Sequence, residues 1–295
     1  MSSHILIVYN PSSGRTRAQE PWKRLVNLLP DFVCTSLNIR TERAQLRSTL
    51  SQCDIAVAVG GDGTVREVIQ ELADLRKKIP LAILPTGSGN LLARSLHLPS
   101  SPRALSRLIR NGTSVSIDLA QLDTGEYFAG ACALGYLSER VGATGQRMKH
   151  IFGFAGYLWF FFLRRRVPQY RFSIRAGNRD YEEIGHSVFI LNASNLFGIH
   201  SRNVESLHDG LFELTVAKNK SLFSFLRLVH DFYFERKGSA RFSLLRGNDF
   251  TVACSEPLPV VLDGEMLHDR KKIRLTVLPA AQRIMVSKAY SEYRR

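Results

Sequence analysis

Short apolar runs alternate with amphipathic stretches through about the first 125 residues of the chain. Runs such as DIAVAV (residues 54–59) and LAIL (81–84) have no polar alternation and end in Gly or Pro, which is typical of strands buried on both faces of a parallel sheet. Repeated strand–helix units of this kind predict a doubly wound α/β domain. The strands expected here are residues 4–9, 32–39, 54–59 and 81–84, and the helices are residues 17–29 and 42–50.

The pattern changes after about Tyr127, where strand-like runs are joined by turns. These runs predict a β-rich, sandwich-like second domain, interrupted by helices over residues 149–163 and 222–234. We therefore expect domains at residues 1–125 and 126–280, with the tail 281–295 packing back on the first. The strands expected in the second domain are residues 170–176, 186–191, 211–217, 250–253, 258–262 and 272–278.

Three strand-to-helix or strand-to-loop turns in the first domain are rich in glycine and small polar residues. GGDGT (residues 60–64) opens an apolar i, i+3, i+4, i+7 pattern, and TGSGN (86–90) and NPSSG (10–14) follow two other strands. Glycine lets a backbone approach a ligand closely, and helix N-termini attract phosphate. Because ligands of open α/β sheets bind at the carboxyl ends of the strands, the three turns predict one phosphate-binding crevice. An isolated Asp-Gly pair, by contrast, is usually an ordinary turn.

Composition and net charge limit the classes of binding partner that the chain can have. The net charge of +14 and the sequence pI near 10.0 favour phosphate, an anionic membrane or nucleic acid. No RNA- or DNA-binding motif is present, so nucleic acid is disfavoured. The four cysteines are widely spaced and the histidines show no metal spacing, which argues against disulfides and structural zinc. The amino-terminal apolar run is too short for a signal peptide, so we expect a cytoplasmic protein.

With these motifs in this order, the sequence resembles the catalytic domain shared by diacylglycerol kinases, sphingosine kinases and their soluble bacterial relatives. A further motif, DGE (residues 263–265), also matches the family, and the resemblance spans essentially the whole chain. It implies a lipid kinase that uses ATP and Mg²⁺. No Walker-type GxxxxGK[ST] or Rossmann GxGxxG sequence competes with this interpretation.

The resemblance implies roles for individual residues. Asp263 and Glu265 would lie at the phosphoryl-transfer centre, with Asp118 as a supporting carboxylate, although DGE also fits a plain hairpin turn. In bacterial relatives an Asp-Asp-Gly sequence holds a structural magnesium ion; here it reads His208, Asp209 and Gly210, and the implied ligands are Asp209 with Ser206 and Leu211. The implied nucleotide-binding residues are Asn10, Pro11, Ser12, Ser13, Gly14, Thr41, Gly60, Gly61, Asp62, Gly63, Thr64, Thr86, Gly87, Ser88 and Asn90.

The acceptor implied is a lipid such as diacylglycerol or a sphingoid base, presented at an anionic membrane surface to which the enzyme binds peripherally at its inner face; a homodimer is also among the expectations. The apolar stretch at residues 152–163 is too short to span a bilayer and fits a core helix or, beside Arg164, Arg165 and Arg166, a membrane-surface segment. Two alternatives stay open. The chain could phosphorylate a soluble acceptor, as NAD kinases do with the same GGDGT turn, or it could bind nucleotide or membrane without catalysis.

Overall fold

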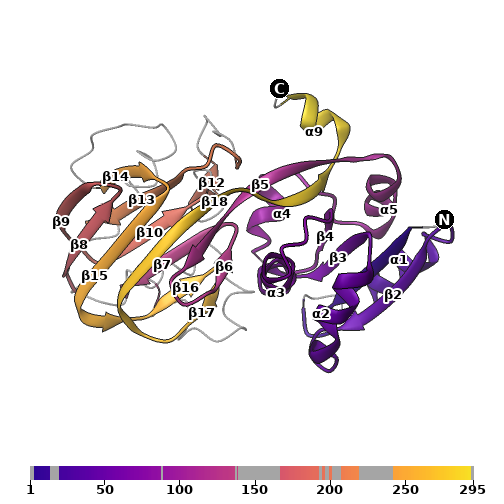
Figure 1. The fold of residues 1–295 in the computed structure, drawn as a ribbon, viewed down its shortest axis with the longest axis horizontal. Helices are drawn as coiled ribbons and strands as arrows, with labels where there is room; N and C mark the ends of the chain where they lie inside the picture. Colours follow the sequence, from indigo (N-terminus) through magenta and orange to yellow (C-terminus); the bar gives the residue numbers. More distant parts are fainter. Residues whose placement is uncertain are drawn as a thin grey trace. The chain divides into compact units, whose positions relative to one another are not determined.

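The chain forms two compact units in the computed structural model (Figure 1), one made of residues 1–117 and 280–295 and the other of residues 118–279. The structure describes residues 3–13, 20–87, 89–136, 138, 167–192, 195–196, 199–200, 207–218 and 242–293. The expected helices at 149–163 and 222–234, the apolar stretch 152–163 and Arg164, Arg165 and Arg166 lie outside these residues.

The first unit is built on a parallel sheet in the order β2-β1-β3-β4-β18. Its inner strands are fully buried along most of their length, which explains their unbroken apolar sequences. The bounds of the strands are β1 His4–Tyr9, β2 Val33–Asn38, β3 Ile55–Gly60, β4 Leu81–Pro85 and β18 Arg270–Val286.

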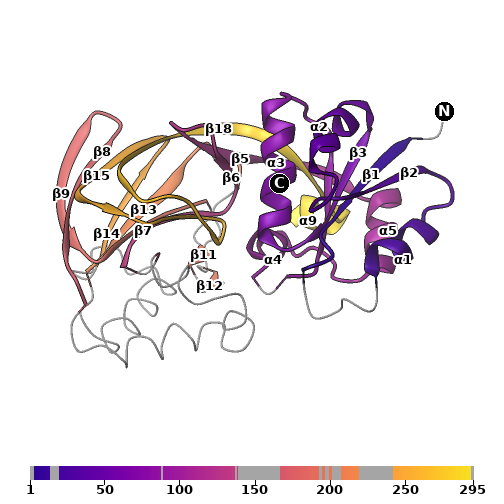
Figure 2. The same ribbon diagram turned by 90° about the horizontal axis from the view of Figure 1, so that it is seen from below.

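Helices cover both faces of this sheet (Figure 2). Leu25 of α1 and Leu105 of α5 pack on the face that contains Ile5 and Ile7, together with Val57 and Val59 of the neighbouring strand. Helices α2 and α3 contact each other; α2 also contacts strands β1 and β2, and α3 contacts strands β1 and β3. The bounds of the helices are α1 Pro21–Asn27, α2 Arg43–Gln52, α3 Asp62–Asp74, α4 Leu91–Ser95, α5 Pro102–Asn111 and α9 Lys288–Tyr293.

The boundary between the units falls after Ile117 rather than after residue 125. It lies inside strand β5 (Thr113–Leu122), because Ala120 and Leu122 belong to the hydrophobic core of the second unit. The chain returns within β18, where Ile284 pairs in parallel with Leu81 of β4. Strand pairing thus makes the carboxyl-terminal residues part of the first unit.

The second unit contains two antiparallel sheets. One has the order β18-β15-β8-β9, with β5 pairing β18 and β6; the other has the order β14-β13-β10-β7-β16-β17. A separate hairpin joins β11 and β12. The strands are β6 Tyr127–Phe128, β7 Ala131–Gly135, β8 Tyr170–Ala176, β9 Arg179–Gly185, β10 Ser187–Leu191, β11 Asn195–Leu196, β12 Ile199–His200, β13 Phe212–Ala217, β14 Phe242–Gly247, β15 Asp249–Leu258, β16 Val260–Leu262 and β17 Glu265–Met266.

A single apolar core draws side chains from both of these sheets. Phe128 of β6 meets Phe212 of β13 edge to face, with ring centroids 5.6 Å apart. Along β8 the buried residues Phe172 and Ile174 alternate with exposed polar ones, as expected for a sheet with one face in the core. The predicted fold class, an α/β domain with a second β-rich sandwich-like domain, is confirmed.

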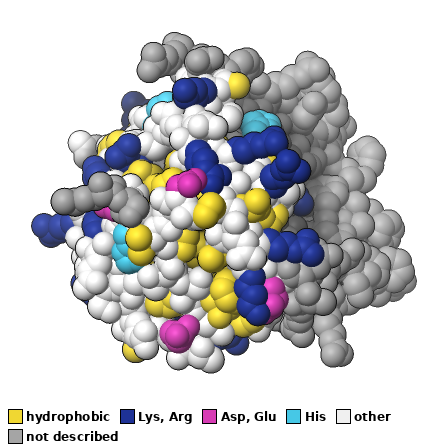
Figure 3. Space-filling view, turned by 90° about the vertical axis from the view of Figure 1, so that its right-hand side faces the viewer, with side chains coloured by type: hydrophobic (Ala, Val, Ile, Leu, Met, Phe, Trp, Pro, Cys, Tyr) yellow, Lys and Arg dark blue, Asp and Glu magenta, His cyan; other side chains and the backbone are white. Residues whose placement is uncertain are grey.

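Basic side chains are prominent on the surface of the molecule, and Figure 3 shows one face where Lys and Arg are more frequent than Asp and Glu. Among the described helices, none is long and apolar enough to cross a membrane. All four cysteines are free thiols.

Candidate active site

The three glycine- and serine-rich loops meet at the carboxyl edge of the parallel sheet in the first unit. The Thr86 hydroxyl donates to the Ser13 Oγ at 3.1 Å, and the backbone N–H of Thr86 donates to the carbonyl of Gly60 at 2.9 Å. Asn10 shapes the first loop, because its side-chain oxygen accepts the N–H of Ser12 at 2.9 Å. The structure therefore brings together the loops that the sequence placed in one crevice.

The remaining predicted nucleotide residues are distributed around this edge. Pro11 lies in the first loop with Ser12 and Ser13, and Thr41 follows β2 at the same edge of the sheet, with its N–H donating to Asn38. Gly63 lies in the first turn of α3. Gly14 and Ser88 lie outside the described residues.

Two glycines make the contact between the second and third loops. A Cβ atom on Gly87 would lie 2.6 Å from the Cα of Gly61, and a Cβ on Gly61 would lie 3.3 Å from the Cα of Gly87. A third glycine, Gly60, leaves room for the side chain of Thr64, whose buried hydroxyl has no hydrogen-bond partner among the described residues. Gly87 is thus required by the packing of one loop on another, and Gly60 by the packing within its own turn, roles that the sequence did not indicate.

The carboxylate of Asp62 links the same two loops through hydrogen bonds. Its carboxylate accepts the backbone N–H of Asn90 at 2.7 Å and that of Leu91 at 2.6 Å, at the start of α4. Asn90 has a left-handed backbone (φ 50°). Its Oδ1 accepts the N–H of Gly87 at 3.1 Å, and its Nδ2 donates to the carbonyl of Gly87 at 2.6 Å. Asp62 therefore fixes the shape of the TGSGN loop, while the first turn of α3 presents backbone N–H groups suited to phosphate.

The DGE motif of the second unit forms a two-residue hairpin between β16 and β17. Asp263 and Gly264 both have positive φ, 45° and 86°, and Leu262 pairs with Glu265. This is the backbone conformation for which Asp-Gly is favoured, so the hairpin interpretation of the motif is confirmed. Glu265, half-buried, begins the returning strand.

The carboxylate of Asp263 is held by three consecutive backbone N–H groups. Ala129 donates to Oδ2 at 3.0 Å, and Gly130 and Ala131 donate to Oδ1 at 2.9 and 2.8 Å. Gly130 has to be a glycine, because a Cβ there would lie 2.8 Å from Oδ1. Both carboxylate oxygens are therefore engaged by backbone donors of the protein. Asp263 consequently serves to fix the hairpin on the start of β7.

Asn192 is a positioning residue that the sequence analysis missed. Its side chain is buried, and its Nδ2 donates to the carbonyls of Asp118 and Ala129 at 3.0 and 3.1 Å, while its N–H donates to Gly130 at 2.8 Å. It thereby links Asp118 to the segment that holds Asp263. The sequence feature that could have identified Asn192 is an amide side chain directly after the buried strand β10.

Asp118 is fully buried and acts within this framework. Its Oδ2 accepts the N–H of Gly210 at 2.6 Å, and its own N–H donates to the carbonyl of Leu207 at 2.7 Å. These contacts tie the buried Asp118 to the turn at residues 207–210, which fits the supporting role that the family resemblance implies.

The buried thiol of Cys132, near Asp263, predicts how the stability of the protein depends on pH. Burial, and to a smaller extent the charge of Asp263, raises the pKa of Cys132 well above its usual range. The unfolded thiol ionises near pH 8.5 while the folded one stays protonated, so the free energy of unfolding should fall above that pH by up to about 1.4 kcal/mol per unit. Denaturant unfolding from pH 8 to 10 measures this, and Cys132→Ala should remove that part of the slope. If Cys132→Ala keeps the wild-type slope while Cys254→Ala changes it, the assignment to Cys132 is wrong.

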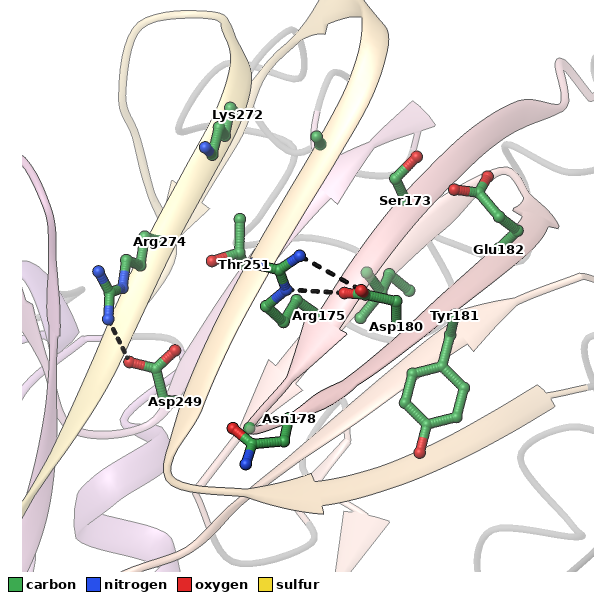
Figure 4. A pocket seen from close by; sticks show the side chains of 13 residues that line it. Ser173, Arg175, Asn178, Asp180, Tyr181, Glu182, Asp249, Thr251, Lys272 and Arg274 are labelled. Carbon is green, nitrogen blue, oxygen red and sulfur yellow. Dashed lines mark hydrogen bonds and ion pairs between the residues drawn. The ribbon is translucent and has the colours of Figure 1, made fainter.

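A hollow on the outer face of the β9-β8-β15-β18 sheet is a poor acceptor site (Figure 4). Arg175 pairs with Asp180 at 2.7 Å, and Arg274 pairs with Asp249 at 3.0 Å. These charges are satisfied within the sheet, and few apolar side chains line the hollow. Charged and polar side chains outnumber apolar ones among the described residues that line it, which disfavours it as a site for a hydrocarbon chain.

Comparison with known proteins gives a consistent relationship. Residues 4–122 match the family described as "Diacylglycerol kinase catalytic domain". The diacylglycerol kinase of Bacillus subtilis (strain 168) is 28% identical over 281 residues, 88% of each chain, and that of Staphylococcus saprophyticus is 30% identical over 242 residues, 75% of each chain.

Solved structures share the fold. A Bacillus anthracis protein described as a diacylglycerol kinase superposes with a TM-score of 0.82 at 22% identity, covering 98% of this chain and 96% of the other. An Archaeoglobus fulgidus NAD kinase in complex with ATP gives a TM-score of 0.57 at 14% identity, with the same coverage. The α/β architecture is thus common to kinases with different acceptors.

Proposed function

The chain belongs to the superfamily of diacylglycerol kinase and sphingosine kinase catalytic domains, and on that premise we propose that it transfers the terminal phosphoryl group of ATP to a hydroxyl group of a lipid. Membership identifies it as a kinase of the diacylglycerol kinase type; the nucleotide and the acceptor are what is proposed. The observation that carries the nucleotide part is the meeting of three loops at one sheet edge, joined by Asp62 and by the Gly61–Gly87 contact.

In this proposal the loops of the first unit bind the triphosphate. Phosphoryl transfer needs positioning and charge neutralisation more than covalent chemistry, and backbone N–H groups at the start of α3 supply both. A magnesium ion bound to the phosphates would neutralise the charge that builds up between them. No group of three metal-binding side chains occurs among the described residues, so such an ion would take most of its ligands from phosphate and water.

Glu265 is the proposed proton acceptor. The hydroxyl proton of an alcohol leaves late in the transfer, so an ordinary carboxylate in the right position is sufficient. Of the two DGE carboxylates, Asp263 is held by three N–H donors, whereas Glu265 starts the strand that follows the turn. Because both oxygens of Asp263 are engaged in holding the start of β7, Glu265 is the carboxylate of the motif that we assign to the hydroxyl proton.

A lipid acceptor is favoured by the family names of the relatives and by the net charge of +14, which suits an anionic lipid surface. Purified protein should be incubated with γ-labelled ATP, magnesium and vesicles that contain diacylglycerols, monoacylglycerols, ceramides, sphingoid bases or phosphatidylglycerol, with and without anionic lipid. A labelled lipid identifies the acceptor. Label on NAD⁺, included as a soluble acceptor, would identify an NAD kinase-like activity instead, and no turnover with any acceptor would contradict a catalytic role.

A further inference from the structure

The turn that precedes β13 is where the family resemblance implies a structural magnesium ion, and its described geometry does not fit one. Asp209 Oδ1 accepts the N–H of Leu211 at 2.9 Å, and Asp209 Oδ2 contacts the guanidinium of Arg246 at 2.5 Å. Both oxygens of the implied ligand are therefore engaged by donors of the protein itself. Ser206 lies outside the described residues.

The charges also disfavour a divalent ion at this turn. Where the family resemblance implies two acidic residues, this chain has His208 before Asp209, so the turn at residues 207–211 carries one carboxylate, and Arg246 is paired with it. Magnesium binds carboxylate oxygens at about 2.0–2.1 Å, so an ion on Asp209 would lie within a few ångströms of the guanidinium charge. Two cations sharing one carboxylate repel each other strongly.

Strand pairing fixes the position of Arg246 close to the turn that precedes β13. It lies on β14 directly opposite Glu213 of β13, so a second carboxylate is on the neighbouring position of the sheet. Its side chain is 39% exposed and that of Asp209 is 23% exposed, which makes the pair partly shielded from water. The planar guanidinium, always charged, is well suited to replace a metal ion beside a carboxylate.

We propose that the guanidinium of Arg246 takes the place of the structural cation, so that the Leu207–Leu211 turn of this chain is held without a metal ion. The turn in question is the one anchored on Asp118, through the N–H of Gly210 and the carbonyl of Leu207. Arg246 thereby acts through Asp209 as a positioning residue for the framework around Asp118. This inference does not depend on the identity of the phosphoryl acceptor or on whether the chain is catalytic.

Thermal unfolding without nucleotide tests the proposal. The wild-type melting temperature should be the same with EDTA as with added Mg²⁺ or Mn²⁺. Arg246→Gln should lower it by roughly 2 to 4 °C, the size expected when a chain of this length loses one partly buried ion pair. Arg274→Gln, which breaks the Arg274–Asp249 pair on another sheet, is the matched control for losing an arginine.

The decisive variant is the double substitution His208→Asp with Arg246→Gln, which restores the acidic pair and removes the guanidinium. It should gain a Mg²⁺-dependent rise in melting temperature and bind Mn²⁺ detectably by electron paramagnetic resonance, whereas Arg246→Gln alone and Arg274→Gln should not. A wild-type protein that EDTA destabilises and Mg²⁺ restores would overturn the proposal. So would an unchanged melting temperature of Arg246→Gln, or a double variant that does not respond to metal.

Discussion

Glu265→Gln is expected to lower kcat by a factor of about 10² to 10⁴, the usual cost of removing a general base. The substitution keeps the size and shape of the side chain but removes its ability to accept the hydroxyl proton. Because Glu265 is half-buried at the start of a short strand, the melting temperature and the affinity for ATP should remain close to those of the wild type. Steady-state kinetics, nucleotide titration and thermal unfolding measure the three quantities.

Asp263→Asn should behave differently, although Asn-Gly suits the same turn. An amide offers one acceptor oxygen where the carboxylate offers two, and its NH₂ group would face one of the three N–H donors. A buried donor left unsatisfied costs about 1 to 3 kcal/mol, so this variant should lose stability as well as activity. Glu256→Gln makes the same substitution as Glu265→Gln at an exposed position of β15, so it controls for the loss of one negative charge.

The turnover and the stability of these two variants together show which carboxylate accepts the proton. Normal turnover in a stable Glu265→Gln protein would remove Glu265 as the base. If Asp263→Asn were as stable as the wild type and inactive, Asp263 would be the group that receives the proton, and the three N–H donors would orient it rather than occupy it.

Much of the fold follows from local patterns. The strands at residues 4–9 and 170–176 have the predicted bounds, and the buried strands of the parallel sheet are those with unbroken apolar sequences. The boundary between the units lies several residues before the predicted one. Strand β5 already carries side chains of the second core, although its pattern of apolar and polar residues does not change at that point.

The candidate site was predictable only in part, since its parts are joined by contacts distant in sequence. Asp62 and Leu91 are separated by 29 positions, and Asp263 and Gly130 by 133 positions. Motif order predicted that the loops share one sheet edge, but not that a carboxylate of one loop holds the N–H groups of the next. The pairing of Asp209 with Arg246 was hidden in the same way, because it depends on the register of β13 with β14.

The second large effect concerns the contact between the glycine loops. Gly87→Ala should lower kcat/KM for ATP by about 10²-fold, the scale of a 1 Å misplacement of a binding group. The new Cβ would lie 2.6 Å from the Cα of Gly61 and 2.9 Å from Asn90 Oδ1, so the two loops must separate. Separation strains the bonds by which Asp62 holds Asn90 and Leu91, and with them the shape of the triphosphate site.

Gly61→Ala distinguishes loop packing from ligand approach as the reason for these glycines. Its Cβ would lie 3.3 Å from the Cα of Gly87, a tight contact that a few tenths of an ångström relieve, and its extended backbone (φ −92°, ψ −171°) accepts alanine. If loop packing dominates, Gly61→Ala loses less kcat/KM and less ATP affinity than Gly87→Ala, with both proteins folded by circular dichroism. If a phosphate must instead approach Gly61 itself, Gly61→Ala is the more damaging of the two, because its methyl group would stand in the path of the ligand whatever the loops do.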